Sequence, residues 1–115
     1  MNLRQVSKDE RGEIYILTKE GELCNILITK AGKARGGCIH KVDEHLIVLK
    51  GEIELFLYNQ GKIFKEGECV TIPSTTPHYF KSIIDSVVSE SGAKGEILGK
   101  YEPHLDEINK INSTE

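Results

Sequence analysis

Short stretches in which apolar and polar residues alternate predict strands along most of the chain. Glu13–Leu17 and Leu23–Thr29 alternate with a period of two, which is typical of a strand with one buried face. Turns containing glycine separate such stretches at intervals of about eight to twelve residues. This series of short strands favours an antiparallel sandwich or barrel over an alternation of strands and helices. Further strands are expected at residues 45–50, 52–58, 62–65, 68–73, 78–84, 86–90 and 96–100.

The pattern changes near the C-terminus, where apolar residues recur at helical spacing. Leu105, Ile108 and Ile111 would share one face of a helix over about residues 103–112. Acidic residues come early in this segment and Lys110 comes late, as the helix dipole favours. The sequence therefore predicts a short amphipathic helix after the strands.

The number and spacing of these elements predict a single domain. Residues 1–115 leave room for one core, with a barrel at about residues 12–100 followed by the helix. The strands at 45–50 and 52–58 flank a turn at Gly51, and we expect them to form a hairpin.

The composition excludes some classes of partner. Charged residues make up 29% of the chain and the net charge is −3, with no basic stripe, so no nucleic-acid partner is expected. No apolar run approaches the roughly 20 residues of a membrane-spanning helix. The polar N-terminus also lacks a signal-like region, so we expect no membrane association and a cytoplasmic location. The three cysteines include no CxxC pair, which fits a reducing compartment, and Cys24 and Cys69 are expected to be buried small residues.

Residues capable of chemistry gather between Gly32 and Gly51. Cys38, His40 and Glu44 lie at i, i+2 and i+6, so they can point to the same side of an extended chain. A thiol, an imidazole and a carboxylate on one face suit a divalent metal or a proton-transfer site. The alternative is a polar strand face that meets only water.

This segment resembles the first motif of the cupin family. In that motif a glycine is followed at fixed spacing by two histidines, a glutamate and a second glycine, and here cysteine replaces the first histidine. The matching positions are Gly32, Cys38, His40, Glu44 and Gly51.

A second segment, Gly67–Ser82, resembles the second cupin motif. Gly67, Pro73 and His78 match at the family's spacing, whereas Thr75 replaces a glycine and Ser82 an asparagine. Together the two resemblances imply an all-β fold, the cupin double-stranded β-helix or jelly-roll barrel.

The cupin resemblance also implies a set of metal ligands. His40, Glu44 and His78 would correspond to family ligands, with Cys38 in the place of the fourth. Such a set would hold a divalent metal: the thiolate favours Zn or Fe, while Mn or Ni are not excluded. The alternative is a metal-free pocket that merely tolerates Cys38.

A further resemblance concerns substrate. Asp9–Gly12 and Ala34–Lys41 are similar to segments of cupins that epimerise or isomerise nucleotide-linked deoxysugars. It implies that His40 acts as acid or base and that Arg35 binds a phosphate or sugar oxygen. It also implies a catalytic phenol, supplied by Tyr79 or Tyr15.

Three functions follow as alternatives. The first is a sugar-nucleotide isomerase or epimerase of carbohydrate or polysaccharide synthesis, whose partner is a nucleotide sugar. The second is a metal-dependent oxygenase or isomerase, and the third a non-catalytic cupin that binds a metal or small ligand. A homodimer is expected, because a barrel of this size leaves sheet edges that a second copy can cover. His45 and His104 are expected to be solvated.

Overall fold

The computed structural model describes residues 1–92 and 97–113. Its elements follow the predicted order of strands and a final helix, and the all-β jelly-roll barrel with a C-terminal helix is confirmed. The elements are β1 (Asn2–Asp9), β2 (Gly12–Lys19), β3 (Glu22–Thr29), β4 (Ala34–Gly36), β5 (Cys38–His40), β6 (Glu44–Lys50), β7 (Glu52–Leu57), β8 (Gln60–Lys65), β9 (Cys69–Ile72), β10 (His78–Ser82), β11 (Ser86–Ser91), β12 (Ile97–Lys100) and α1 (Glu102–Ser113).

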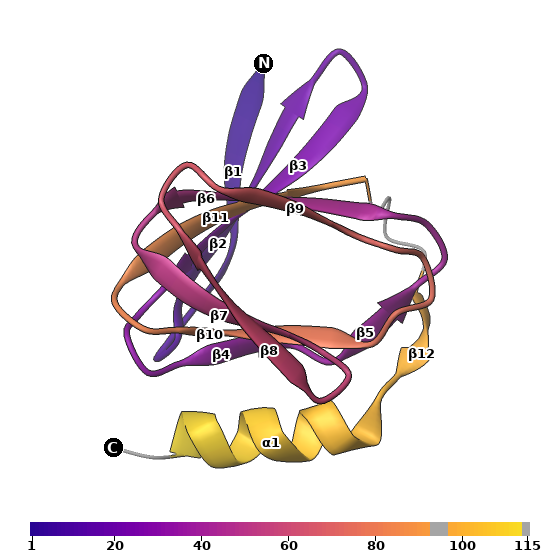
Figure 1. Cartoon of the computed structure of the whole chain (residues 1–115). Coiled ribbons are helices and arrows are strands. Elements are labelled where there is room, and N and C mark those ends of the chain that lie inside the picture. The colour runs from indigo at the N-terminus through magenta and orange to yellow at the C-terminus, as the bar shows by residue number, and fades with distance from the viewer. Residues whose placement is uncertain (93–96, 114–115) are drawn as a thin grey trace.

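Two main sheets face each other and enclose the core (Figure 1). The larger has the order β1-β2-β3-β11-β6-β9 and the smaller the order β4-β10-β7-β8, while β12 and β5 form a short two-stranded sheet. The free ends of β1 and of the β2–β3 hairpin extend beyond the barrel. Of the last predicted strand, residues 97–100 form β12, and Glu96 lies outside the described residues.

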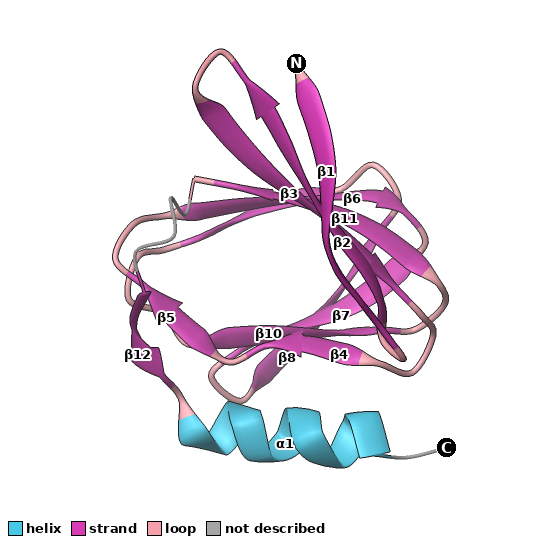
Figure 2. Ribbon diagram, turned by 180° about the vertical axis from the view of Figure 1, so that it is seen from behind, coloured by secondary structure: helices cyan, strands magenta, loops and turns pink. Residues whose placement is uncertain are grey.

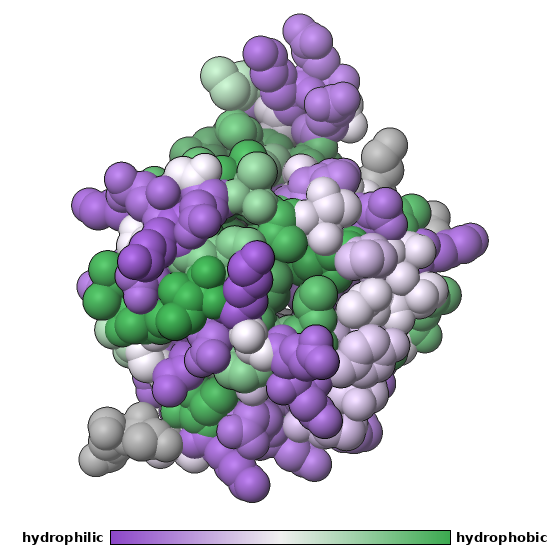
Figure 3. Space-filling model, viewed as in Figure 1, coloured by the Kyte–Doolittle hydropathy of each residue, from purple (hydrophilic) through white to green (hydrophobic). Residues whose placement is uncertain are grey.

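Alternation along the strands fills the space between the sheets with apolar side chains. In β6 the burial alternates residue by residue, so Leu46 and Val48 point inward while Ile47 points outward. The buried core consists of Leu27, Leu46, Val48, Ile53, Leu55, Phe64, Ile72, Phe80 and Val88. Figure 3 shows hydrophobic residues also reaching the surface on the face that carries β8 and β9. No helix in residues 1–92 and 97–113 is long and apolar enough to cross a membrane.

The C-terminal helix covers the outer face of the four-stranded sheet (Figures 1 and 2). Ile108 packs there against Ala34 and Tyr79 in a second buried cluster. The prediction that His104 is solvated was wrong, because the helix begins at Glu102 and its first turn faces the sheet. His104 is only 3% exposed, and its Nε2 lies 2.6 Å from the Tyr58 carbonyl oxygen.

The predicted hairpin of β6 and β7 was also wrong. The turn at Gly51 is tight, but it carries the chain from one sheet to the other: β6 pairs with β11 and β9, and β7 pairs with β10 and β8. Gly51 has φ of 88°, and a side chain there would overlap the Asp85 carbonyl oxygen. The strand β1 was not predicted, because its exposed polar sequence has little apolar alternation.

Candidate metal and ligand-binding site

A cavity of about 270 Å³ is lined by β2 and β3 of the larger sheet and by β4 and β10 of the smaller one, among other strands. Figure 2, seen from behind, shows β2 and β3 on one side of the barrel and β4 and β10 on the other. The chemistry-bearing residues on its wall fall into two groups, a cationic pair, Arg11 and Arg35, and a group that includes Cys38, His40, His78 and Glu90. The predicted site segments therefore do meet inside the barrel.

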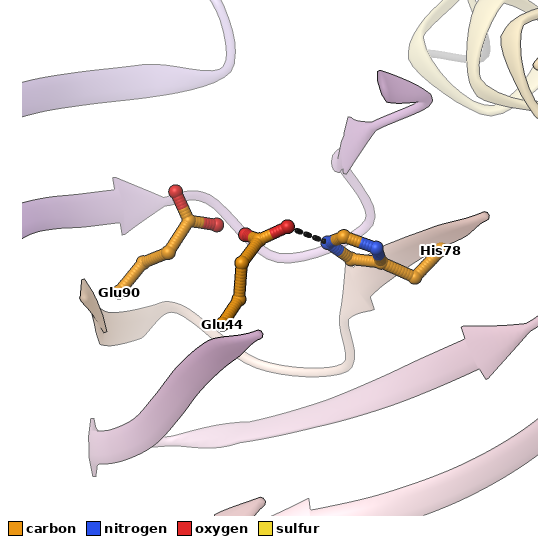
Figure 4. Close-up of side chains that lie close together, drawn as sticks. All are labelled: Glu44, His78 and Glu90. Carbon is orange, nitrogen blue, oxygen red and sulfur yellow. Dashed lines mark ion pairs between the residues drawn. The ribbon is translucent and has the colours of Figure 1, made fainter. Parts of the chain in front are cut away.

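Three side chains from different strands converge (Figure 4), and two of them, His78 and Glu90, line this cavity. Glu44 from β6, His78 from β10 and Glu90 from β11 each offer one ligand atom, and these atoms lie within 4.8 Å of one another. The Glu44 carboxylate lies between the other two, with its Oε1 3.5 Å from His78 Nε2. The sequence analysis had assigned Glu44 and His78 to one site, and in the structure these two side chains are in contact.

A backbone contact on the side of the ring away from Glu44 fixes the orientation of His78. Its Nδ1 lies 3.0 Å from the Thr76 carbonyl oxygen, which can only accept, so Nδ1 carries a hydrogen and donates it. In the neutral ring Nε2 then carries a lone pair, which is directed at Glu44 Oε1. Such a second partner is how proteins hold a histidine for metal binding.

The charges of this pair depend on each other. Burial disfavours the charged form of His78, but its hydrogen bond to Glu44 outweighs burial and raises the pKa of His78. Burial likewise opposes ionisation of Glu44, but His78 and then His40 outweigh it, so the pKa of Glu44 is lowered. The remaining oxygen of Glu44, Oε2, is buried and has no hydrogen-bond partner among the described residues.

Glu90 is the member of the group that the sequence analysis missed, because it lies outside both motifs. Asn25 Nδ2 donates a hydrogen bond to its Oε1 at 3.1 Å. Burial and then the negative charge of Glu44 raise the pKa of Glu90. A signal was present in the sequence: Glu90 shares the inward face of its strand with the fully buried Val88.

The other two predicted ligands, His40 and Cys38, do not belong to the converging group. His40 Nε2 is 3.6 Å from Glu44 Oε1, and the His40 side chain is 16% exposed against 2% for Glu44. Cys38 lines the cavity wall. In the described part of the chain, neither joins the set of ligand atoms that converge with Glu44. Of the remaining cysteines, Cys24 is half-buried, whereas Cys69 is exposed and its predicted burial was wrong.

Arg35 reaches across the barrel from β4 to the end of β3. Its Nε donates to Thr29 Oγ1 at 2.9 Å and its Nη2 to the Ile28 carbonyl oxygen at 3.3 Å. The side chain is 5% exposed, and burial followed by the charge of Arg11 lowers its pKa. Arginine nevertheless stays cationic at any physiological pH, so the barrel contains a buried positive charge.

No tyrosine among residues 1–92 and 97–113 lines the cavity. Tyr79 lies one residue after His78 and therefore faces outward, where its ring stacks on Phe56 at 4.7 Å beneath the helix. Burial raises the pKa of Tyr79, so it stays neutral. Tyr15 donates its hydroxyl hydrogen to Glu13 instead of lining the cavity.

Comparison with known proteins agrees with this architecture. A family model described as a cupin domain matches residues 28–89, which include both sequence motifs. No curated protein sequence matches the chain significantly.

Solved structures share the fold at low sequence identity. KdgF from a Halomonas species is 16% identical with a TM-score of 0.65, over 75% of this chain and 81% of that one. An RmlC-like cupin from Shewanella frigidimarina is 14% identical with a TM-score of 0.66, over 81% and 85% of the two chains. A protein of unknown function from Vibrio parahaemolyticus is 11% identical with a TM-score of 0.67, over 79% and 98%. At such identities the likeness is one of fold.

Proposed function

Because the chain belongs to the cupin family, we propose that its cavity is a metal centre at which proton transfer isomerises a small oxygen-bearing molecule. The observation that carries this proposal is the convergence of Glu44, His78 and Glu90, whose ligand atoms lie within 4.8 Å of one another inside the barrel. Three such groups from three separate strands are not needed to hold a barrel together. Their convergence instead suits a cation.

The residues present fit a divalent metal. When His78 is neutral, its Nε2 and Glu44 Oε1 are two acceptors that face each other at 3.5 Å, so either the proton that charges His78 or a metal ion must lie between them. Glu44 Oε2 is buried without a partner, and a cation would remove the cost of that unpaired oxygen. Carboxylate and imidazole ligands suit Zn, Fe, Mn or Ni. The preference for Zn or Fe that the Cys38 thiolate implied loses support, because Cys38 is not in the converging set.

The chemistry divides between groups that bind and groups that move protons. A bound metal would polarise a carbonyl or hydroxyl oxygen as a Lewis acid. Glu44 and His78 are too enclosed to reach a ligand freely, with side chains 2% and 7% exposed. His40 is the most accessible of the three, and its Nε2 is close enough to Glu44 to exchange a proton after modest movement. We therefore assign His40 as the acid or base.

Metal content is the first test of this proposal. Protein purified without added metal should contain close to one equivalent of a divalent metal, measured by elemental analysis. Glu44→Gln should lose it, and His45→Ala should retain it, because His45 is exposed on the opposite face of β6. Metal-free wild type that also fails to bind added Zn, Fe(II), Mn or Ni would overturn the metal centre.

Solvent exchange tests the proton transfer without knowledge of the natural substrate. Metal-loaded protein is incubated in D₂O with aldoses, ketoses and hydroxy or oxo acids, and carbon-bound hydrogen is followed by NMR. We expect exchange in at least one compound class, and we expect His40→Gln to remove the exchange but retain the metal. Binding without exchange across the panel would leave a non-catalytic cupin, the third alternative.

A sugar-nucleotide epimerase is the second candidate, favoured by one observation. Arg11, Arg35 and His40, which lie in the two segments that resemble those enzymes, all line the same cavity. The volume of about 270 Å³ is small, so only the sugar would fit inside and the nucleotide would lie outside. Nucleotide sugars are included in the exchange panel, with and without metal. Exchange that continues without metal would favour the epimerase, and exchange that requires metal would favour the metal centre.

A further inference from the structure

We propose that Arg35, supported by Arg11, forms a subsite for the carboxylate of a small organic acid, at the opposite end of the cavity from Glu44, His78 and Glu90. This inference names a ligand class for the cavity. It does not depend on whether a metal binds there, since it rests on different residues.

The first observation is an incomplete set of hydrogen bonds on a buried cation. Arg35 Nε and Nη2 have protein acceptors, but Nη1 is buried and has no hydrogen-bond partner among the described residues. Arg35 also forms part of the cavity wall. The guanidinium is held in place by two bonds and its third nitrogen is unpaired, so an anion bound against Arg35 would complete its hydrogen bonding.

The second observation is the charge at this end of the cavity. Arg11 is paired with Asp9, with its Nη2 2.7 Å from Asp9 Oδ2. Glu10 also acts on Arg11, but it is exposed, so solvent screens its charge. The two guanidinium groups and the Asp9 carboxylate then leave a single positive charge. A singly charged carboxylate would neutralise it, whereas a phosphate monoester, which carries close to two negative charges, would leave an excess. The charge therefore favours a carboxylate.

The third observation is the distance between the two ends. Arg35 bonds to Thr29, and Glu90 bonds to Asn25, four residues earlier on the same strand β3. Four residues of strand span roughly 13 Å, which is the separation we take for Arg35 and Glu90 along β3. A ligand that forms a hydrogen bond of about 3 Å to each of them would itself span roughly 7 Å. Leu27 lies between these positions and lines the cavity, so the middle of the ligand should be apolar.

These three constraints describe one class of compound. It is a monocarboxylic acid with a hydroxyl or oxo group roughly five or six carbons away, which would reach the acidic end. The two carboxylates at that end, Glu44 and Glu90, would repel the acid group and fix the direction of binding.

Binding to metal-free protein tests the subsite directly. The probes are 6-hydroxyhexanoate and its neutral amide, 6-hydroxyhexanamide, measured by NMR titration with wild-type protein. We expect the carboxylate to bind at least tenfold more tightly than the amide. Equal affinities would overturn the proposal, and so would tighter binding of 6-hydroxyhexyl phosphate than of the carboxylate.

Two substitutions at the partly exposed Asp9–Arg11 pair supply opposite expectations without disturbing the core. Asp9→Asn adds one unit of positive charge and should tighten carboxylate binding about threefold, whereas Arg11→Gln should weaken it about threefold. Arg4→Gln is the control, because Arg4 is exposed and does not line the cavity. Shifts of the same sign in Asp9→Asn and Arg11→Gln would overturn the charge argument.

Arg35→Gln should lose carboxylate binding at least tenfold while the amide is unaffected. If this variant fails to fold, the wild-type comparison and the Asp9 and Arg11 variants still decide the question. Metal binding by the same wild-type preparation is measured separately. Carboxylate binding without metal binding would therefore overturn the metal centre alone, and the reverse result would overturn the subsite alone.

Discussion

Glu90 is the single residue that best tests how the metal centre is built. Because its carboxylate converges with Glu44 and His78, we predict that Glu90→Gln lowers metal affinity roughly 10- to 100-fold. Cys38→Ser should change it less than about threefold, because the thiol lines the cavity outside the converging group. Isothermal titration with Zn and with Mn measures both.

The comparison between the two metals separates a ligand from a bystander. If Cys38 does coordinate, Cys38→Ser will weaken Zn binding far more than Mn binding, because it replaces a soft ligand with a hard one. A large, Zn-specific loss in Cys38→Ser together with no loss in Glu90→Gln would restore the ligand set that the family motif implied.

The buried acid and base groups predict how the stability of the metal-free protein depends on pH. The pKa of His78 is raised, so its contribution is complete below about pH 6.5 and is lost as pH rises through the folded pKa. The pKa of Glu90 is also raised, so its contribution to stability is complete below about pH 4.3 and is likewise lost as pH rises. The pKa of Glu44 is lowered, so its contribution to stability is complete above about pH 4.3 and is lost only as pH falls through its folded pKa.

The metal-free protein should therefore be less stable at pH 8.5 than at pH 6, as measured by thermal unfolding. Bound metal should reduce or reverse this decline, because its ligands bind in their deprotonated forms. His78→Gln should flatten the decline in the metal-free protein, whereas His45→Gln should leave it unchanged. An identical slope in wild type and His78→Gln would contradict the assignment to His78.

At the residue scale, strand alternation predicted more than the motifs did. It correctly placed His78 inside the barrel, and the same rule places its neighbour Tyr79 outside, where the structure finds it. The catalytic role for Tyr79 came from resemblance and ignored this parity. Glu90 was predicted to lie on a strand, but only the three-dimensional pairing of β11 with β6 shows that it meets Glu44.

At the scale of elements, strand positions were predictable and strand partners were not. The pattern of apolar residues located the segments that became β2, β3 and β6 to β11. Alternation describes which face of a strand is buried, and both sheets of a barrel bury a face in the same core. The sequence therefore could not show that β6 and β7, which are adjacent in the chain, belong to opposite sheets.

The short strand β4 depends on a glycine, which gives a prediction at this scale. A side chain on Gly36 would come within 2.7 Å of the Tyr79 Cα on the paired strand β10. We expect Gly36→Ala to lower the free energy of unfolding by about 3 kcal/mol or more, because β4 must move away from β10. Chemical denaturation measures the change.

Gly21→Ala is the matched control for this substitution. Gly21 also has a positive φ, of 82°, but it has open space where its side chain would lie. Its cost should be about 1 kcal/mol, which is that of the backbone conformation alone. Equal losses in the two variants would mean that the contact between β4 and β10 is not the constraint.

At the scale of the whole molecule, the two sheets differ in how their outer faces are covered. The helix α1 packs on the four-stranded sheet. The six-stranded sheet has no helix on its outer face within residues 1–92 and 97–113, and it presents Leu3, Ile47 and Leu49, which are 58%, 41% and 48% exposed. Its strand β1 is also a free edge, since it pairs only with β2. An apolar sheet face next to a free edge is a surface that a partner can cover.

We predict that a second copy of the chain covers this face, because a two-fold dimer is the commonest way for one protein to cover its own surface. Light scattering at tens of micromolar should give the mass of a dimer. Ile47→Glu should dissociate it, since it places a charge among the exposed apolar side chains of this face. Ile63→Glu is the control, because Ile63 is at least as exposed, at 48% against 41% for Ile47, but lies on β8 of the other sheet. A monomeric wild type would overturn the prediction, and a dimer that Ile63→Glu dissociates and Ile47→Glu does not would place the interface on the opposite sheet.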